Sequence, residues 1–212
     1  MAVRQATITI DSRWGMPTTH LLETHPHASG LAVIFPGSNY PVDAPLLRFA
    51  RMAALEDGFD VLSLEYSFQT NRREMQQEGL PTLVDEALHA LNAVPLHYQT
   101  IVLVSKSLGT VIGSQVQQRL SSTLAIHHHI FLTPLAPAID GIRRTNHAMV
   151  VVGTKDLLFD ADQVELVSQL TSVELHKVQN ANHALEVESY PGSLQILQDV
   201  TKWCADFLRS SL

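Results

Sequence analysis

The chain has 212 residues, of which 45% are hydrophobic and 17% charged, a composition that excludes a disordered polypeptide and can build a substantial core. This length suits one large domain or at most two small ones, and the lack of a repeat, low-complexity stretch or Pro/Gly/Ser-rich linker predicts one domain over residues 1–212. The formal charge of −7 disfavours nucleic acid and anionic membranes as partners, because neither surface gains electrostatically from the contact.

The first residues, the apolar runs and the cysteine content predict the cellular setting. Residues 1–14 lack the basic segment and following apolar segment of a secretory signal. The longest apolar runs are strand-sized and too short to cross a bilayer. The single cysteine, Cys204, excludes an internal disulfide, and its place in a helical tail favours a small buried side chain. We therefore expect a soluble, cytoplasmic protein.

Hydrophobic periodicity predicts the secondary structure along the chain. The first two strands alternate apolar and polar residues, whereas most of the later strands are continuously apolar. Pro81 opens one helix at its first turn, and Gly58 ends another. In chain order we predict strands 3–10, 18–23 and 31–35, helix 44–57, strand 60–64, a helix that begins at Pro81, strand 101–104, helix 108–120, strands 130–132 and 149–152, helix 161–170, strand 173–178 and helix 193–208.

The alternation of strands and helices from residue 31 onward predicts the fold. Continuously apolar strands are typical of a parallel sheet that helices bury on both faces. We therefore predict an α/β fold, a three-layer α/β/α sandwich with a mostly parallel sheet of seven or eight strands. Reactive groups in such a sheet collect in the loops at the carboxyl ends of the strands.

The loop after the fifth predicted strand reads Ser105-Lys106-Ser107-Leu108-Gly109 and leads into a helix. A serine presented at the tip of such a sharp turn needs very small residues two positions before and after it. Gly109 meets this requirement, whereas Ser105 stands where glycine is usual. The pentapeptide alone is equally compatible with helix capping, so Ser107 needs support from elsewhere as a candidate nucleophile.

Two later loops supply that support. A serine hydroxyl needs a base to accept its proton and a third group to orient that base. Asp156 follows the strand at 149–152, and His183 follows the strand at 173–178. The order Ser107, Asp156, His183, each directly after a separate strand, predicts that all three side chains lie at one edge of the sheet.

On these motifs the chain resembles the α/β-hydrolase family over almost its whole length. The resemblance implies Ser107 as nucleophile, His183 as general base and then general acid, and Asp156 as the group that fixes the imidazole tautomer. It also implies an oxyanion hole made by the backbone N–H groups of Ser38 and Leu108. In the loop before Ser38, proline replaces the histidine that is usual in the family.

Other residues compete for the acid and base roles. Asp160 and Asp162 lie at the start of a predicted helix, where aspartate is a common cap, and Asp140 follows the preceding strand.

The histidines at 127–129 adjoin a strand, whose successive side chains point to opposite faces, so they do not converge easily on one metal. We predict a partly exposed strand entry there, with neither a metal nor a cofactor.

Three more side chains at this edge are candidates for substrate binding. Tyr40 and Tyr66 follow strands, where aromatic rings either pack or line a pocket. Lys106, beside the candidate nucleophile, is either a solvated residue or a contact for an anionic substrate.

The triad predicts acyl transfer to water, with small-molecule esters or thioesters as substrates because their leaving groups depart more readily than amines. About sixteen residues separate the strands at 130–132 and 149–152, which leaves room for a turn and one short helix. We therefore expect a lidless, shallow site for a small or exposed ester.

Two alternatives are a non-catalytic binding protein of this fold and a nucleotide-binding domain, whose glycine-rich motifs the sequence lacks. The oligomeric state is not predicted.

Overall fold

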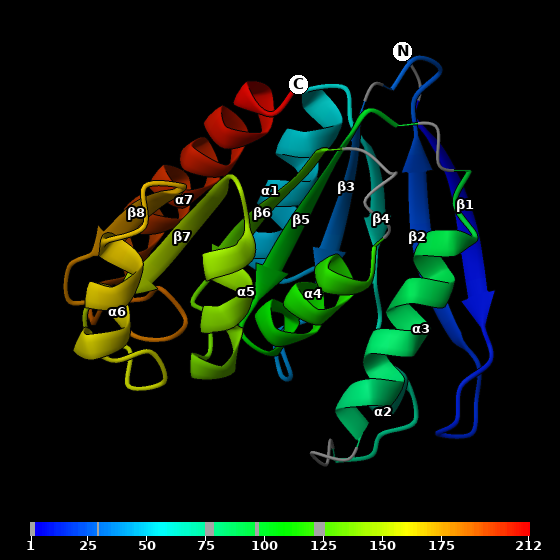
Figure 1. The fold of residues 1–212 in the computed structure, drawn as a ribbon, viewed down its shortest axis with the longest axis horizontal. Helices are drawn as coiled ribbons and strands as arrows, with labels where there is room; N and C mark the ends of the chain where they lie inside the picture. Colours follow the sequence, from blue (N-terminus) through cyan, green and yellow to red (C-terminus); the bar gives the residue numbers. More distant parts are fainter. Residues whose placement is uncertain (1–2, 29, 75–78, 96–97, 121–125) are drawn as a thin grey trace.

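The computed structural model describes residues 3–28, 30–74, 79–95, 98–120 and 126–212, and one sheet runs through this part of the chain. Its strands are β1 (Arg4–Ile10), β2 (Thr18–Thr24), β3 (Gly30–Phe35), β4 (Asp60–Ser63), β5 (Thr100–Lys106), β6 (Ile126–Leu132), β7 (Ala148–Gly153) and β8 (Val173–Val178). They lie in the order β1-β2-β4-β3-β5-β6-β7-β8 (Figure 1). β2 is antiparallel to both of its neighbours, whereas all the pairs from β4 to β8 are parallel.

Helices cover both faces of this sheet. They are α1 (Pro45–Glu56), α2 (Ser67–Thr70), α3 (Leu80–Asn92), α4 (Leu108–Arg119), α5 (Ile139–Arg144), α6 (Ala161–Ser168) and α7 (Tyr190–Ser210), with a short 3₁₀ helix, η2 (Ala136–Ala138). α1 and α7 pack on one face, and α3, α4, α5 and α6 pack on the other (Figure 1). This is the predicted three-layer α/β/α architecture.

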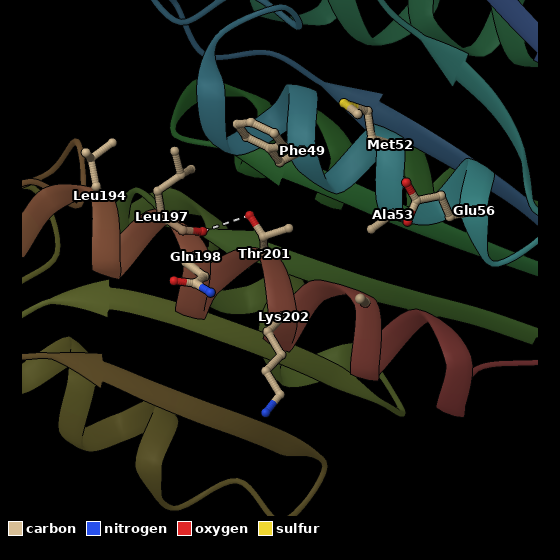
Figure 2. Close-up of a pocket in the computed structure, with 10 residues that line it drawn as sticks. Phe49, Met52, Ala53, Glu56, Leu194, Leu197, Gln198, Thr201 and Lys202 are labelled. Atoms are coloured by element: carbon tan, nitrogen blue, oxygen red, sulfur yellow. Dashed lines mark hydrogen bonds between the residues drawn. The ribbon is translucent and has the colours of Figure 1, made fainter.

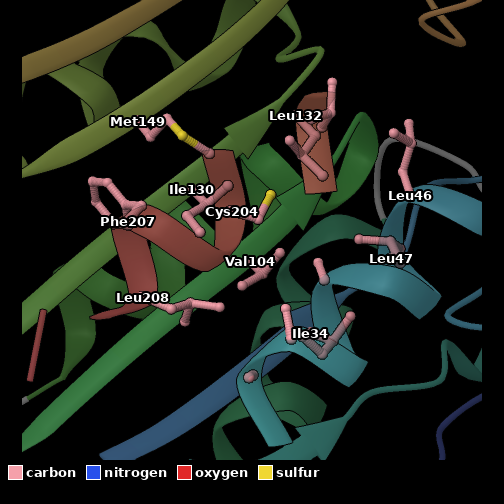
Figure 3. Packing of buried hydrophobic residues seen from close by; sticks show 14 of the residues in the cluster. Ile34, Leu46, Leu47, Val104, Ile130, Leu132, Met149, Cys204, Phe207 and Leu208 are labelled. Atoms are coloured by element: carbon pink, nitrogen blue, oxygen red, sulfur yellow. The ribbon is translucent and has the colours of Figure 1, made fainter. Parts of the chain in front are cut away.

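The central strands are buried on both sides, as their continuous apolar sequences require. On the face under α1 and α7, Ile34 and Val104 from neighbouring strands contact a layer that includes Leu47 and Phe207 (Figure 3). Burial of each such side chain contributes about 1.5–3 kcal/mol. Cys204 lies in this layer with no exposed surface, as predicted, and burial raises the pKa of its thiol to about 12.

The observed elements follow the predicted order and differ from it mainly at their ends. β6 begins at Ile126, so the histidines at 127–129 lie inside a strand rather than at its entry. α7 begins at Tyr190, three residues earlier than predicted, because a helix accepts Pro191 in its first turn. α2 is not predicted, since four residues are too few to show a helical period.

The segment between β6 and β7 holds η2 and α5, which agrees with the short insertion that its length predicts. No other helix or strand intervenes between residues 133 and 147, all of which the structure describes. Among the described helices, none combines the length and the apolar character needed to span a membrane.

Candidate active site

The turn between β5 and α4 holds Ser107 in a rarely populated backbone conformation. Its φ is 52° and its ψ is −117°, a region that L-residues enter only under constraint. Its backbone N–H donates to the carbonyl of Leu132, which ties the turn to the end of β6. A Cβ on Gly109 would lie 2.5 Å from the carbonyl oxygen of Phe35, so only glycine lets α4 approach β3 this closely. These constraints hold Ser107 at the tip of the turn.

Ser105 fits the position where glycine is usual because the residue that faces it on α4 is itself a glycine, Gly113. A Cβ on Gly113 of α4 would lie 2.6 Å from the Oγ of Ser105. The Ser105 hydroxyl is 2.7 Å from Nε2 of His129, whose Nδ1 is 3.0 Å from Oε1 of Gln117. Because the Gln117 oxygen accepts, Nδ1 carries the proton and Nε2 accepts from Ser105. The serine therefore satisfies a buried histidine of β6.

The stability of the protein should fall on acidification because of two buried neutral histidines. Burial lowers the pKa of His129 to about 3 and that of His20 to about 4. Below the unfolded value of 6.5, the unfolded chain binds protons that the folded chain cannot. We therefore expect each histidine to lower the free energy of unfolding by up to about 1.4 kcal/mol per pH unit from pH 6.5 down to about its folded pKa.

Urea unfolding of the wild type, His129→Gln and His20→Gln at several pH values between 7 and 4.5 measures this contribution. Each variant should lose part of the slope, because glutamine does not bind a proton. The prediction would be contradicted if the free energy of unfolding changed with pH in both variants as steeply as in the wild type.

The three candidate catalytic side chains meet at the carboxyl ends of β5, β7 and β8. The Oγ of Ser107 is 2.9 Å from Nε2 of His183, and Nδ1 of His183 is 2.8 Å from Oδ2 of Asp156. The other carboxylate oxygen of Asp156 accepts the backbone N–H of Leu158 at 2.9 Å. Because a carboxylate accepts only, it holds the imidazole proton on Nδ1 and leaves Nε2 free to accept from Ser107. The side chain of Asp156 is fully buried and that of His183 is one-quarter exposed.

The loop that carries His183 lies directly against the end of β7. A Cβ on Gly153 would lie 2.2 Å from the carbonyl oxygen of Ala181, so glycine is required for this approach. The backbone N–H of Lys155 donates to the same oxygen at 2.9 Å. This contact brings the loop after β8 within reach of Asp156.

The rival carboxylates have other roles or positions. Asp160 is the N-cap of α6. Its side chain accepts the backbone N–H of Gln163, and the side-chain oxygen of Gln163 accepts the backbone N–H of Asp160. Asp162 is exposed in the first turn of the same helix. Asp140 is exposed in the first turn of α5. Among the described residues, Asp156 is the carboxylate that is hydrogen-bonded to His183.

The two backbone N–H groups predicted to form the oxyanion hole have no internal acceptor among the described residues. They belong to Ser38, in the turn after β3, and to Leu108, the first residue of α4. The turn is held by Gln69 of α2, whose Nε2 donates to the carbonyls of Gly37 at 3.1 Å and Ser38 at 2.6 Å. Both acceptors are main-chain carbonyls, so the sequence alone does not predict this contact.

The structure corrects one of the three candidate substrate contacts and places the other two at the cavity wall. Tyr66 is 2% exposed and stacks on Phe68 within the core, so it does not line the site. Lys106 is not solvated, because it is 2% exposed and its ammonium donates to Thr133 and to the carbonyl of His183, but its side chain lines the cavity over Ser107. Tyr40 does line the site, and its hydroxyl accepts the backbone N–H of Leu46.

A cavity of about 630 Å³ opens over Ser107, a volume typical of small-molecule sites. Three leucines contribute aliphatic side chains to its wall, and two exposed asparagines contribute amides. Of the residues around it, Lys106 is the one lysine or arginine, and its ammonium is already bonded within the protein. The cavity is lined by Gly37, Ser38, Asn39, Tyr40, Lys106, Ser107, Leu108, Leu135, Leu158, Asn182, His183 and Ala184.

A second cavity, of about 510 Å³, lies between α1 and α7 and does not include the triad (Figure 2). Phe49 and Met52 of α1 border it opposite Leu194 and Leu197 of α7. The hydroxyl of Thr201, which lines this cavity, donates to the main-chain carbonyl of Leu197 in the same helix. In the described ranges, no group of three or more His, Cys, Asp or Glu side chains is arranged to hold a metal ion.

Comparison with known proteins identifies the fold. No family model and no curated protein sequence matches the chain. Among solved structures, an esterase of Pyrococcus furiosus shares 10% identity at a TM-score of 0.71, covering 99% of this chain and 91% of its own. A dienelactone hydrolase of Anabaena variabilis shares 14% identity at a TM-score of 0.73, covering 99% of both chains.

A third solved structure is a serine hydrolase without a lid from Xanthomonas campestris. It shares 16% identity at a TM-score of 0.69, covering 100% of this chain and 97% of its own. Such identities speak for architecture and not for substrate. Coverage of whole chains, together with the observed strand order and helical layers, shows that this chain has the α/β-hydrolase fold.

Proposed function

We propose that this protein is a serine hydrolase that cleaves carboxylic esters or thioesters through an acyl-enzyme intermediate. One observation carries the proposal: the hydrogen-bonded chain from Ser107 through His183 to Asp156, with distances of 2.9 and 2.8 Å. Such a chain makes a hydroxyl nucleophilic, because the base can accept its proton as the new bond forms. The constrained backbone of Ser107, which exposes the hydroxyl at the turn, also supports this role.

In the first half of the reaction, Oγ of Ser107 attacks the substrate carbonyl carbon while its proton moves to Nε2 of His183. The backbone N–H groups of Ser38 and Leu108 bind the negative oxygen that forms. His183 then gives its proton to the leaving oxygen or sulfur, and the alcohol or thiol departs. In the second half, water gives a proton to His183 as its oxygen attacks the acyl carbon. His183 then returns that proton to Oγ of Ser107 as the bond between Oγ and the acyl carbon breaks, which releases the acid and restores the serine.

The wall of the cavity favours a neutral substrate with an apolar acyl or alcohol group. Leu108, Leu135 and Leu158 offer aliphatic contacts, and no free ammonium or guanidinium lies among the lining residues to pair with a carboxylate. Burial of one methylene against such a wall is worth about 0.8 kcal/mol. We therefore expect neutral esters of short to medium chain length to be hydrolysed faster than anionic esters of the same size.

A fluorophosphonate probe and an ester panel test the proposal. The probe should label the wild type at Ser107, and p-nitrophenyl and acyl-thioester substrates of graded chain length should define the preference. Hydrolysis that persists undiminished in Ser107→Ala would reject the mechanism. Failure of the probe to label the wild type would favour a binding protein instead.

Gln69 provides a test of the oxyanion site that leaves the triad intact. Its amide holds the carbonyls of Gly37 and Ser38 from the outside of the turn. Gln69→Leu should lower kcat by about 10-fold or more with little change in KM, because displaced backbone donors weaken binding of the transition state more than binding of the ester. Gln118→Leu, on the exposed side of α4, is the control and should keep wild-type kinetics. A rise in KM with constant kcat would contradict this role.

A further inference from the structure

Lys106 is a buried lysine that the proposed reaction does not use. It is the last residue of β5 and immediately precedes Ser107. Successive strand residues point to opposite faces, so Lys106 leaves the sheet on the side away from Ser105 and its partner His129. Only 2% of Lys106 is exposed, although its side chain contributes to the wall of the cavity.

The ammonium of Lys106 joins three loops of the site. It donates to the hydroxyl of Thr133, in the loop after β6, and to the main-chain carbonyl of His183 at 2.9 Å. It also lies 5.1 Å from the centre of the Tyr40 ring, in the turn after β3, within the range of a cation–π contact. Thr133 itself has a φ of 43°, so the acceptor for Lys106 is held in an unusual backbone conformation.

We propose that Lys106 is a positioning residue that fastens the loop of His183 to the nucleophile turn through a charged hydrogen bond to the carbonyl of His183. This inference rests on the proposed hydrolase function and adds a residue to it. The loop after β8 reaches the triad from the far side of β7, and the bond from Lys106 couples its position to the residue next to Ser107. A shift of about 1 Å in a reacting group lowers a rate on the order of 100-fold.

The charge of Lys106 makes this bond sensitive to pH. Burial lowers the pKa of Lys106 to about 8, while the nearby charge of Asp156 acts in the opposite direction. The other titratable groups that face it are His183, through its main chain, and Tyr40, whose pKa burial raises. Charged donors form stronger hydrogen bonds than neutral ones. The bond from Lys106 to the carbonyl of His183 therefore weakens as Lys106 loses its proton.

The rival role, recognition of an anionic substrate, needs a free ammonium. Two of the three N–H donors of Lys106 are already directed at oxygens of the protein. The ammonium also lies 5.1 Å from the centre of the Tyr40 ring, and Lys106 is only 2% exposed, which leaves little access for an anion. The contacts therefore favour positioning.

Lys106→Met tests the proposal, with Lys106→Arg and Thr133→Val beside it. The control is Lys177→Met, which removes the same charge from an exposed position on β8. We measure kcat and KM from pH 6 to 10 with one neutral and one anionic ester of equal length. Hydrogen exchange of residues 179–188 and of β3 is followed at pH 7.

For Lys106→Met we expect kcat to fall about 10- to 100-fold for both esters, with KM changed little and faster exchange in residues 179–188 but not in β3. The wild type should lose activity as pH rises through about 8, and Lys106→Met should lack this step. Lys106→Arg keeps its charge and should lack the step as well, and Thr133→Val should show a smaller loss of kcat.

Wild-type kcat and loop exchange in Lys106→Met would overturn the inference, as would a loss confined to the anionic ester, which would mean substrate contact. If Lys106→Met does not fold, an alkaline step that persists in Lys106→Arg overturns it instead. Failure of the wild type to react with the fluorophosphonate probe would reject the hydrolase function. The exchange of residues 179–188 still tests the link between Lys106 and the loop in that case.

Discussion

Replacing Ser107 by alanine is expected to remove ester hydrolysis, with kcat reduced by roughly 10⁴- to 10⁶-fold. The reason is that Nε2 of His183, now 2.9 Å from the hydroxyl, would have no nucleophile to activate. Fold and cavity should persist, since the methyl group occupies less space than the hydroxymethyl. The rate of hydrolysis of a p-nitrophenyl ester measures the loss. Mass spectrometry should show the fluorophosphonate probe attached to the wild type and not to the variant.

Ser107→Gly is the informative companion variant. It should be equally inactive, yet more stable than Ser107→Ala, because glycine adopts a φ of 52° without strain. Relief of about 1–3 kcal/mol of backbone strain is partly offset by about 0.5–1 kcal/mol for the greater freedom of glycine in the unfolded chain. Urea unfolding of both variants gives the difference. Equal stabilities would mean that the turn holds no strain.

Asp156→Asn is expected to lower kcat by about 10⁴-fold while the fold is kept. The backbone N–H of Leu158 donates to Oδ1 of Asp156, so the asparagine carbonyl oxygen should keep that bond. Its NH₂ group then faces Nδ1 of His183, where the Oδ2 oxygen now accepts at 2.8 Å. An NH₂ group there requires Nδ1 to accept, which moves the imidazole proton to Nε2 and blocks proton transfer from Ser107.

Asp160→Asn is the matched control, because it makes the same chemical change four residues away. Asparagine caps a helix as well as aspartate does, so both stability and kcat should stay near the wild type. A loss of kcat in Asp160→Asn as large as that in Asp156→Asn would return the acid role to the rival carboxylate. Retention of full activity by Asp156→Asn would reject the proposed orientation of His183.

The fold was largely predictable because its strongest signals are local and repeated. The continuous apolar strands need burial on two faces, and the helical spacing between them supplies the covering layers. The position of Asp156 and His183 followed from the same topology, since the carboxyl ends of parallel strands share one edge. The element ends and the short helix α2 were less accessible, because one helical turn has no period to detect.

The parts of the site that escaped prediction depend on contacts between distant segments. Ser105 is explained by Gly113 and His129, eight and twenty-four residues further along the chain, and a pentapeptide pattern contains neither. Gln69 and Lys106 are long polar side chains that read as solvated until their acceptors are known. Gln69 donates to two main-chain carbonyls and Lys106 to one, and a main-chain carbonyl carries no sequence signal.

The close approach of Gly153 to the carbonyl of Ala181 also bears on the order in which the molecule can acquire its activity. The turn that holds Ser107 needs β3, β5, β6 and α4, but its base arrives from the end of β8, the last strand along the chain and an edge of the sheet. A folding chain that has assembled every earlier strand would still carry an unactivated serine. Covalent trapping of Ser107 during refolding would therefore time the docking of the final edge strand, separately from collapse of the core.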